Sequence, residues 1–294
     1  MLGKDIVSIL IKEVNYEVYG IDRNYNSTLT KDKQFNIDLT NHNLLNQILL
    51  RIEPDIIVHC AAIVNLDLCQ NNKELAYNLH FKTTRLLSAF NSLETKFIYI
   101  STDSVFDGIK GNYSEEEIPN PLNYYAKSKY MGELISLKNN KNTVVIRTNI
   151  YGFKNPEGHS LAEWALENFK NNKQIDGFKD VIFNPLYTKQ LARLIYKLIQ
   201  DNKFTGILNA SSAEYISKFE FLNRIAMIWG FNKELVKEIN MTDLAFSVLR
   251  PKNTTLKTQK LSLLFNEIPQ FNEGLNEFFK DYMEFLIERN DLNV

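Results

Sequence analysis

A tyrosine and a lysine four residues apart, Tyr125 and Lys129, are the residues whose types and spacing best suit a chemical reaction. At positions i and i+4 of a helix, the phenol and the ammonium lie on one face. A neighbouring cation favours the phenolate and so brings the pKa of a phenol, ordinarily near 10, toward neutral pH. The pair therefore predicts proton transfer to a carbonyl oxygen or from a carbinol.

The segment before Tyr125 can supply a third group. The β-branched and aromatic run 97–100 predicts a strand that ends at Ser101 and Thr102, and a loop with glycine and proline leads from there to the helix of Tyr125. The hydroxyl of Thr102, or that of Ser101, would reach the same substrate oxygen. The spacing itself is a weak signal, because a chain with 14 tyrosines is expected to contain roughly one such pair by chance. Only Tyr125 has a lysine at this spacing, and the alternative is an ordinary surface helix.

Composition narrows the class of protein. The 294 residues are 44% hydrophobic, and 34 basic against 35 acidic residues give a net charge of −1, which provides no electrostatic basis for binding nucleic acid or a membrane surface. We therefore expect a small-molecule partner. Cys60 and Cys69 form neither a disulfide framework nor a metal-ligand spacing, so we expect no metal and a cytoplasmic location. No apolar run reaches the length of about 18 residues that a membrane span needs.

Strands and helices alternate as far as residue 150, which predicts an α/β fold with a Rossmann-like, doubly wound parallel sheet. The apolar run 55–60 predicts a strand buried on both faces, with His59 as a core residue. Residues 74–90 predict one long helix. From residue 151 to 294, longer helices predict a smaller C-terminal substrate-binding lobe, with some segments returning to the sheet. We therefore expect a cofactor domain over 1–150 and a lobe over 151–294.

The first residues suit a dinucleotide-binding unit. In such a unit a glycine turn precedes a helix, and an acidic residue about 20 positions later binds the adenosine ribose. Gly3 opens a helical pattern and Asp22 follows 19 residues later. On this interpretation the earlier glycines and the first strand lie before Met1, so we expect Met1 to be internal to a longer reading frame. The strands ending at Asp22 and Cys60 would then lack a partner between them.

Eight segments, in this order, resemble the extended short-chain dehydrogenase/reductases of the dTDP-4-dehydrorhamnose reductase type: MLGKD, YGIDR, HCAA, STDSVFDG, YAKSK with MGE, RTNIYG, NPLYTKQLA and RPKNTTL. The resemblance implies NAD or NADP as the cofactor. It implies Tyr125 as the catalytic acid, Lys129 as its partner and a ribose ligand, and Thr102 as the hydroxyl that holds the substrate oxygen. The residues expected along the cofactor are Gly3, Asp22, Arg23, Asp38, Leu39, Ala61, Ala62, Asn78, Tyr125 and Lys129.

The same resemblance implies NAD(P)H-dependent reduction of a nucleotide-linked 4-keto sugar. The expected substrate ligands are Asp103, Asn149, Tyr187 and Arg250, and the guanidinium of Arg250 suits a diphosphate. RTNIYG resembles instead the Asn-x-Tyr-Gly of sugar-nucleotide epimerases and dehydratases, which remain alternatives. A non-catalytic homologue like the regulatory β subunit of methionine adenosyltransferase is a third. For the choice of cofactor, Asp22 favours NADH, whereas Arg23 could pair with the 2′-phosphate of NADPH. For the assembly, a homodimer is one possibility.

Overall fold

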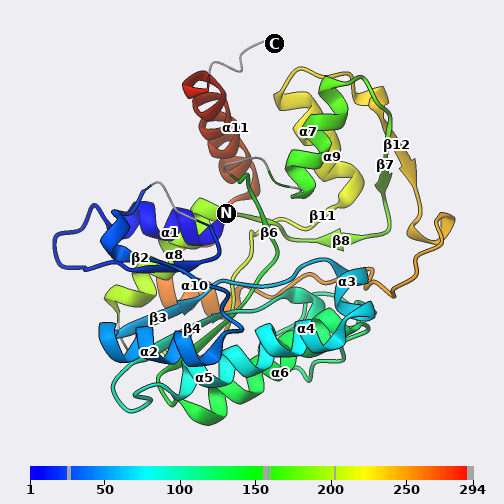
Figure 1. Cartoon of the computed structure of the whole chain (residues 1–294). Helices are drawn as coiled ribbons and strands as arrows, with labels where there is room; N and C mark the ends of the chain where they lie inside the picture. The colour runs from blue at the N-terminus through cyan, green and yellow to red at the C-terminus, as the bar shows by residue number, and fades with distance from the viewer. Residues whose placement is uncertain (25–27, 155–157, 159, 202, 290–294) are drawn as a thin grey trace.

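Parallel strands with helices on both sides form the lower part of the molecule in Figure 1. The computed structural model describes residues 1–24, 28–154, 158, 160–201 and 203–289. A four-stranded sheet has the order β10-β5-β4-β3, and every neighbouring pair in it is parallel. Its strands are β3 (Ile56–His59), β4 (Lys96–Ile100), β5 (Thr143–Arg147) and β10 (Gly206–Asn209). This confirms the predicted α/β fold with a parallel central sheet.

Helices cover both faces of this sheet, and all five residues of β4 and of β5 are buried. One face packs against α1 (Leu2–Leu10), α8 (Thr188–Gln200) and α10 (Gln259–Phe265). The other face packs against α2 (His42–Ile52), α5 (Thr84–Ala89) and α6 (Tyr124–Asn139). Unbroken apolar runs such as 97–100 follow from this arrangement, because neither face of the strand meets water.

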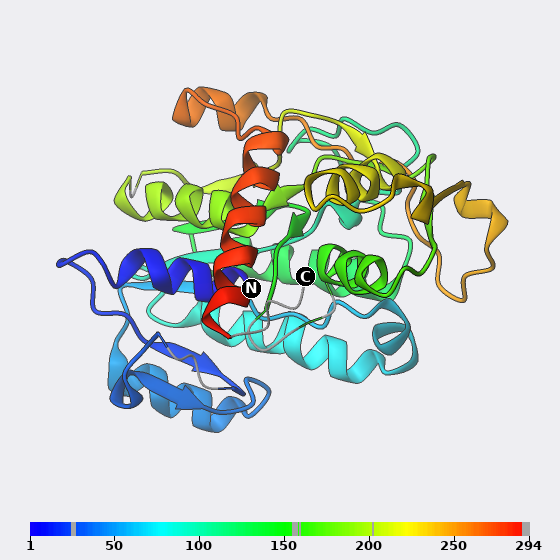
Figure 2. The same cartoon turned by 90° about the horizontal axis from the view of Figure 1, so that it is seen from above.

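The parallel strands fall into two separate sheets. β1 (Gly20–Asp22) pairs with β2 (Gln34–Asn36), and among the described residues neither strand pairs with β3. Figure 2 shows this blue pair with α2 at one side of the molecule. The prediction that run 55–60 is buried on both faces is wrong for most of β3, where His59 is buried but the three residues before it are only half-buried. Because β3 has a ladder partner on one side only, its side chains lack the cover that a second neighbouring strand provides.

The predicted helix 74–90 contains a wider turn. The structure has α4 (Lys73–Tyr77), then the π-helical turn η2 (Asn78–Thr83), then α5, in one continuous helical path. A π turn holds one more residue than an α turn, and such turns occur frequently at functional sites. Hydrophobic periodicity does not reveal a single wide turn, so the sequence predicted a regular helix.

The upper lobe in Figure 1 contains α7 (Leu161–Lys170), α9 (Lys218–Ile228) and α11 (Phe271–Glu288). Three two-stranded pairs accompany these helices: β6 (Ile150–Tyr151) with β9 (Leu186–Tyr187), β7 (Ile175–Phe178) with β12 (Val236–Ile239), and β8 (Ile182–Phe183) with β11 (Ile216–Ser217). Its core is rich in aromatic rings, and Tyr151 lies edge-on against Phe221, Phe271 and Phe278. After residue 150, α8, β10 and α10 return to the sheet.

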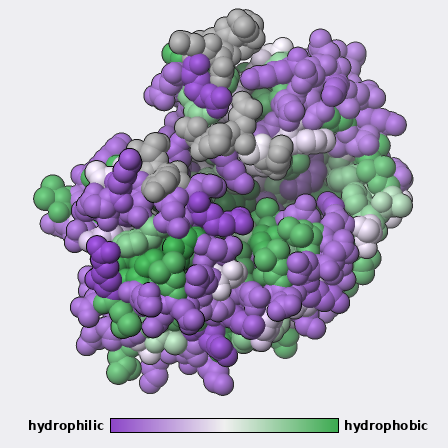
Figure 3. All heavy atoms as spheres, in the orientation of Figure 1, coloured by the Kyte–Doolittle hydropathy of each residue, from purple (hydrophilic) through white to green (hydrophobic). Residues whose placement is uncertain are grey.

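The remaining elements are short: α3 (Leu66–Asn71) and the 3-10 turns η1 (Lys31–Lys33), η3 (Asp103–Val105), η4 (Lys233–Leu235) and η5 (Met241–Asp243). None of the helices in the described part of the chain combines the length and apolar character that a membrane span needs. Figure 3 shows a recess in the molecular surface between the upper lobe and the sheet domain. The site described below lies where the strands of the sheet end toward this lobe.

Candidate active site

Helix α6 carries Tyr125 and Lys129, and its start is fixed by Asn123. The side chain of Asn123 accepts a hydrogen bond from the amide of Ala126 at 3.0 Å, which caps the helix, and donates to the carbonyl of Leu249 at 3.0 Å. The face of α6 that meets the sheet carries buried polar side chains, and these are Ser128, Lys129, Glu133 and Ser136. Buried polar groups need partners, so the position of α6 depends on the hydrogen bonds these side chains form.

Tyr125 and Thr102 are joined by a hydrogen bond between their side chains. Thr102 follows β4, and Tyr125 stands in the first turn of α6. Burial raises the pKa of Tyr125 to about 12; the bond from Thr102 opposes this rise, and the charge of Asp103 adds to it. The structure thus brings together the two hydroxyls that the sequence analysis placed on one substrate oxygen.

Lys129 stands one turn after Tyr125 on α6 and is almost fully buried. Its Nζ donates to the carbonyl of Ile100 at 2.7 Å and lies 4.1 Å from the centre of the Tyr99 ring. Burial lowers the pKa of Lys129 to about 7, opposed first by the charge of Glu133. The spacing of Tyr125 and Lys129 predicted a lowered phenol pKa, whereas the pKa of Tyr125 is raised. Burial raises the pKa of the phenol by more than a nearby cation would lower it, and the lysine bonds to a backbone carbonyl instead.

An ion pair between Glu133 and Arg147 joins α6 to β5. Both side chains are 1% exposed, and Arg147 Nη2 lies 2.7 Å from Glu133 Oε2. Ser101 donates to the other carboxylate oxygen at 2.5 Å, so the end of β4 is attached to the same pair. The guanidinium also lies 5.1 Å from the centre of the Phe106 ring. This network was not predicted from the sequence, although Glu133 lies four residues after Lys129 and hence on the same face of the helix.

Asp103 is the centre of a second network that joins the sheet to the late loop. One of its oxygens accepts from Asn149 at 2.8 Å and from Thr254 at 2.5 Å. The other oxygen accepts from Thr102 at 3.2 Å and from Ser104 at 3.3 Å. Two predicted substrate residues, Asp103 and Asn149, are therefore in direct contact and bond to each other. In the structure their hydrogen-bonding groups hold the ends of β4 and β5 against the loop that carries Thr254.

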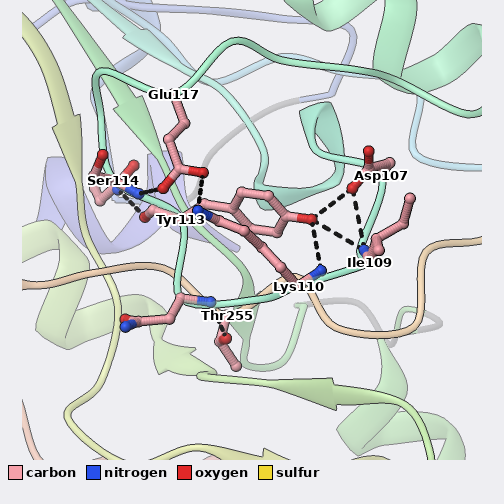
Figure 4. A network of polar contacts seen from close by, with 9 residues as sticks. Asp107, Ile109, Lys110, Tyr113, Ser114, Glu117 and Thr255 are labelled. Carbon is pink, nitrogen blue, oxygen red and sulfur yellow. Dashed lines mark hydrogen bonds and ion pairs between the residues drawn. The ribbon is translucent and has the colours of Figure 1, made fainter.

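The loop after β4 is fixed to the same late loop through Tyr113 (Figure 4). The phenol of Tyr113 donates to Asp107 at 2.6 Å and accepts from the amides of Ile109 and Lys110. Its amide donates to the carbonyl of Thr255 at 2.8 Å. Its ring also stacks on that of Phe106, with centres 4.2 Å apart. These contacts position the loop without using any residue of the predicted site.

Tyr187 and Arg250 are placed differently from the other predicted substrate residues. Tyr187 is buried in the aromatic core of the lobe, and its hydroxyl donates to Asp281 of α11 at 2.7 Å. Arg250 is exposed, with its guanidinium 4.3 Å from the centre of the Phe246 ring. Among the contacts of the described residues, neither side chain joins the Asp103 network.

Three of the predicted cofactor residues flank β1 and β2. The carboxylate of Asp22 accepts from the amide of Asn24 at 3.0 Å, and that of Asp38 accepts from the amide and hydroxyl of Thr40 at 2.8 and 2.7 Å. These bonds lower the pKa of Asp38, and the nearby charge of Arg23 acts in the same direction. Asp22, Arg23 and Asp38 are all exposed at the end of the two-stranded sheet.

The predicted residues nearer the four-stranded sheet meet around η2. Thr83 Oγ1 lies 3.1 Å from the carbonyl oxygen of Leu39 and 3.0 Å from that of Asn78. The side-chain oxygen of Asn78 is buried without a hydrogen-bond partner. Ala61 and Ala62 form part of the loop after β3 and are half-buried.

Gly3 lies in the first turn of α1, and a β-carbon added there would meet nothing within 4 Å. The start of a helix of this length suits a phosphate, because its first amides are free and its dipole favours negative charge. The open space at Gly3 leaves room for the pyrophosphate of a nicotinamide dinucleotide, and the unpaired oxygen of Asn78 can accept a hydrogen bond from such a ligand. These residues are therefore suited to holding the cofactor that the sequence predicts.

Lys218 is a cation near this site that the sequence analysis did not single out. It stands at the start of α9, with Nζ 3.3 Å from the centre of the Phe183 ring. Burial lowers the pKa of Lys218 to about 8, and the charge of Asp103 opposes that change. Its position follows from the fold of the lobe, so no local motif could have identified it. By contrast, a depression of about 850 Å³ between α2 and α5, which Pro54 and Thr95 help to line, lies at the opposite end of the strands.

A parallel sheet with helices on both faces, a tyrosine and lysine four residues apart on α6, a hydroxyl at the end of β4 and a C-terminal lobe define an extended short-chain dehydrogenase/reductase. Residues 1–284 match the family described as RmlD substrate binding domain, and the chain belongs to that family. The resemblance inferred from the eight segments is confirmed.

Relatives of two kinds are among the matches. The chain is 31% identical over 237 residues to methionine adenosyltransferase 2 subunit beta of Danio rerio, covering 77% of this chain and 72% of the relative. It is 25% identical over 281 residues to dTDP-4-dehydrorhamnose reductase of Aggregatibacter actinomycetemcomitans, covering 91% of each. Among solved structures, dTDP-4-dehydrorhamnose reductase of Bacillus anthracis in complex with NADP superposes with a TM-score of 0.80 at 27% identity, covering 90% of this chain and all of the other.

Proposed function

We propose that the protein is an NAD(P)H-dependent reductase of a nucleotide-linked 4-keto sugar, similar in activity to dTDP-4-dehydrorhamnose reductase. The observation that carries the proposal is the meeting of the Thr102 and Tyr125 hydroxyls at the end of β4, with Lys129 buried one turn further along α6. This is the arrangement of groups needed to hold a carbonyl oxygen and protonate it. Relatives with that reductase name, one of them solved with NADP, support both the reaction and the cofactor.

Each of the three residues has a separate task in this proposal. Thr102 donates a hydrogen bond to the keto oxygen and fixes its position next to the phenol. Tyr125 gives its proton to that oxygen as the carbonyl is reduced; its high pKa keeps it protonated, and hence a competent donor, at neutral pH. Lys129, when protonated, supplies positive charge one turn along the helix from Tyr125, and this charge favours the phenolate that remains. The nicotinamide, when bound, supplies the hydride.

The direct test follows the absorbance of NADPH or NADH when the protein is mixed with dTDP-4-dehydro-6-deoxy-L-mannose. We expect oxidation of the cofactor in proportion to the sugar consumed, and loss of that oxidation in Tyr125→Phe. Comparing the rates with the two cofactors at equal concentration also shows which residue sets the cofactor preference. A faster rate with NADH indicates Asp22, and a faster rate with NADPH indicates Arg23. If neither cofactor is consumed at any sugar concentration, the reductase proposal fails.

A regulatory role is the second candidate, because relatives named methionine adenosyltransferase 2 subunit beta match 77% to 86% of the chain. Such a protein would bind a methionine adenosyltransferase catalytic subunit, and Tyr125→Phe would leave that binding unchanged. Co-purification with the catalytic subunit, measured by size-exclusion chromatography, separates this role from the reductase.

An epimerase or dehydratase of the same fold would hold NAD tightly and return it unchanged. Analysis of cofactor that remains with the purified protein tests this third reading. We also propose a nucleotide-sugar substrate as the partner of the recess in Figure 3, and a homodimer as the assembly, which the same chromatography measures.

A further inference from the structure

His80 is a fully buried histidine in the π-helical turn η2, outside every motif of the predicted site. It lies between two elements that the proposed reaction needs. On one side is the loop 61–63 after β3, which contains two of the residues expected along the cofactor. On the other is helix α6 with Tyr125.

The hydrogen bonds of His80 fix its tautomer. The amide of Ile63 donates to Nε2 at 2.9 Å, so this nitrogen carries a lone pair and no proton. Nδ1 must then hold the proton of the neutral ring, and it lies 2.8 Å from the hydroxyl of Ser128. Ser128 donates in turn to the carbonyl of Tyr125 at 2.8 Å. A continuous chain of hydrogen bonds therefore runs from the cofactor loop to the backbone of Tyr125.

Packing reinforces this chain. The edge of the His80 ring meets the ring of Tyr125 at 5.9 Å between centres, with the planes at 80°. Two turns further along α6, a β-carbon on Gly132 would lie 2.6 Å from the carbonyl oxygen of His80 and 2.3 Å from the hydroxyl of Tyr99. Only glycine allows this close approach of α6 to η2. His80 is thus held from two sides, and any displacement of its ring moves Tyr125.

We propose that His80 is a positioning residue that couples the cofactor loop 61–63 to the orientation of Tyr125 through Ser128. The proposal rests on the reductase function, because it concerns the placement of the proton donor. His80 itself does not exchange a proton. The titratable groups around it include Tyr125, Tyr99, Lys129 and His59, and the last two oppose its protonation, as does burial.

Two single replacements separate the two bonds of His80. In His80→Asn, the amide nitrogen can take the place of Nδ1 and donate to Ser128, while the bond to Ile63 is lost. In His80→Gln, the amide oxygen can take the place of Nε2 and accept from Ile63, while the bond to Ser128 is lost. His80→Phe keeps a ring of similar shape and loses both bonds.

In steady-state kinetics, we expect His80→Phe to lower kcat by about tenfold or more, since small displacements of a catalytic group are costly. His80→Asn should recover most of kcat but bind NADPH more weakly, whereas His80→Gln and Ser128→Ala should keep NADPH affinity and lose kcat. His59→Phe is the matched control, because His59 is also a buried histidine, its Nε2 has no partner, and its ring hydrogen-bonds to the backbone of Leu79 and not to Ser128 or Ile63. It should leave kcat within about twofold. Equal losses in His80→Phe and His59→Phe, or unchanged kcat in His80→Phe, overturn the proposal.

Two readouts do not require turnover. Nitrogen NMR of the imidazoles should show His80 neutral with its proton on Nδ1 from pH 5 to 8. The ring signals of Tyr125, labelled selectively, should shift in His80→Phe and Ser128→Ala and remain in place in His59→Phe. If the wild-type protein reduces no keto sugar but these signals behave as stated, the function is wrong and the coupling stands. A proton on Nε2, or Tyr125 signals unmoved by His80→Phe, overturns the coupling whatever the activity.

Discussion

Acidification from pH 7 to pH 5 should destabilise the protein through two histidines. His59 is 3% exposed and His80 is 0% exposed, and burial lowers their pKa values to about 3 and about 2. Because both pKa values are depressed in the folded state, only the unfolded chain takes up protons as the pH falls below about 6.5. Stability is therefore fully present above that pH and falls below it.

The size of the effect depends little on how far the folded pKa values are depressed, since neither histidine is protonated in the folded protein at pH 5. One pKa unit corresponds to about 1.4 kcal/mol, so between pH 7 and pH 5 each histidine removes about 2 kcal/mol and the two together about 4 kcal/mol. Domains are stable by roughly 5 to 15 kcal/mol, so this is a large share. Asp5 acts in the opposite direction, because burial raises its pKa and protonation favours its folded state.

Urea denaturation followed by circular dichroism at pH 7, 6 and 5 measures this loss. His59→Phe is the informative variant: its ring stays between Phe97 and Tyr99, the hydrogen bond to the backbone of Leu79 is lost, and one titrating group is removed. We expect the pH-dependent loss to fall by about half in this variant. Equal free energies of unfolding at pH 7 and pH 5 in the wild type, or an unchanged loss in His59→Phe, would refute the reasoning.

Three substitutions test the site. Tyr125→Phe should lower kcat by about 100-fold or more with cofactor affinity within a few-fold, and more than about a tenth of the rate remaining would exclude Tyr125 as the acid. Lys129→Met should weaken both turnover and NADPH binding, measured by kinetics and fluorescence titration; a loss confined to kcat contradicts the dual role. Glu133→Gln leaves Arg147 buried without its counter-charge and should cost about 3 to 5 kcal/mol in urea denaturation. Glu277→Gln, which breaks a more exposed pair, should cost about 1 kcal/mol or less, and similar costs for both variants would mean that burial does not matter here.

Local sequence patterns predicted the strands and helices well where turn residues clearly bound an apolar run. The strand 97–100 and the helix of Tyr125 both lie where the alternation of apolar runs and turn residues placed them. The π-helical turn was missed because one extra residue in a helix changes neither its polarity nor its boundaries. The exposure of β3 was not predicted because it depends on which strands lie beside it. The apolar run of β3 itself contains no information about its neighbours.

The site was predicted only as far as spacing along the chain could reach. Thr102, Tyr125 and Lys129 lie within a single strand, loop and helix, so one segment of sequence contains them. The bond from Thr254 to Asp103 joins residues 151 positions apart, and only the complete fold brings them together. The pKa of Tyr125 could not be predicted either. The spacing reveals the neighbouring lysine but not the burial of the phenol, which has the largest effect on this pKa.

The division of the parallel strands into two sheets has a consequence for how the protein fluctuates. β1 and β2 are three residues each and partly exposed, whereas β4 and β5 are buried throughout. Amide hydrogens of β4 and β5 should therefore exchange with solvent only when the whole domain unfolds, and those of β1 and β2 through separate local openings. The residues expected to hold a dinucleotide are shared between the two sheets, with Asp22 and Asp38 on one and Tyr125 beside the other. Occupancy by such a ligand would bridge two units that otherwise open independently, so protection of β1 and β2 should rise toward that of β4 as the cofactor is added.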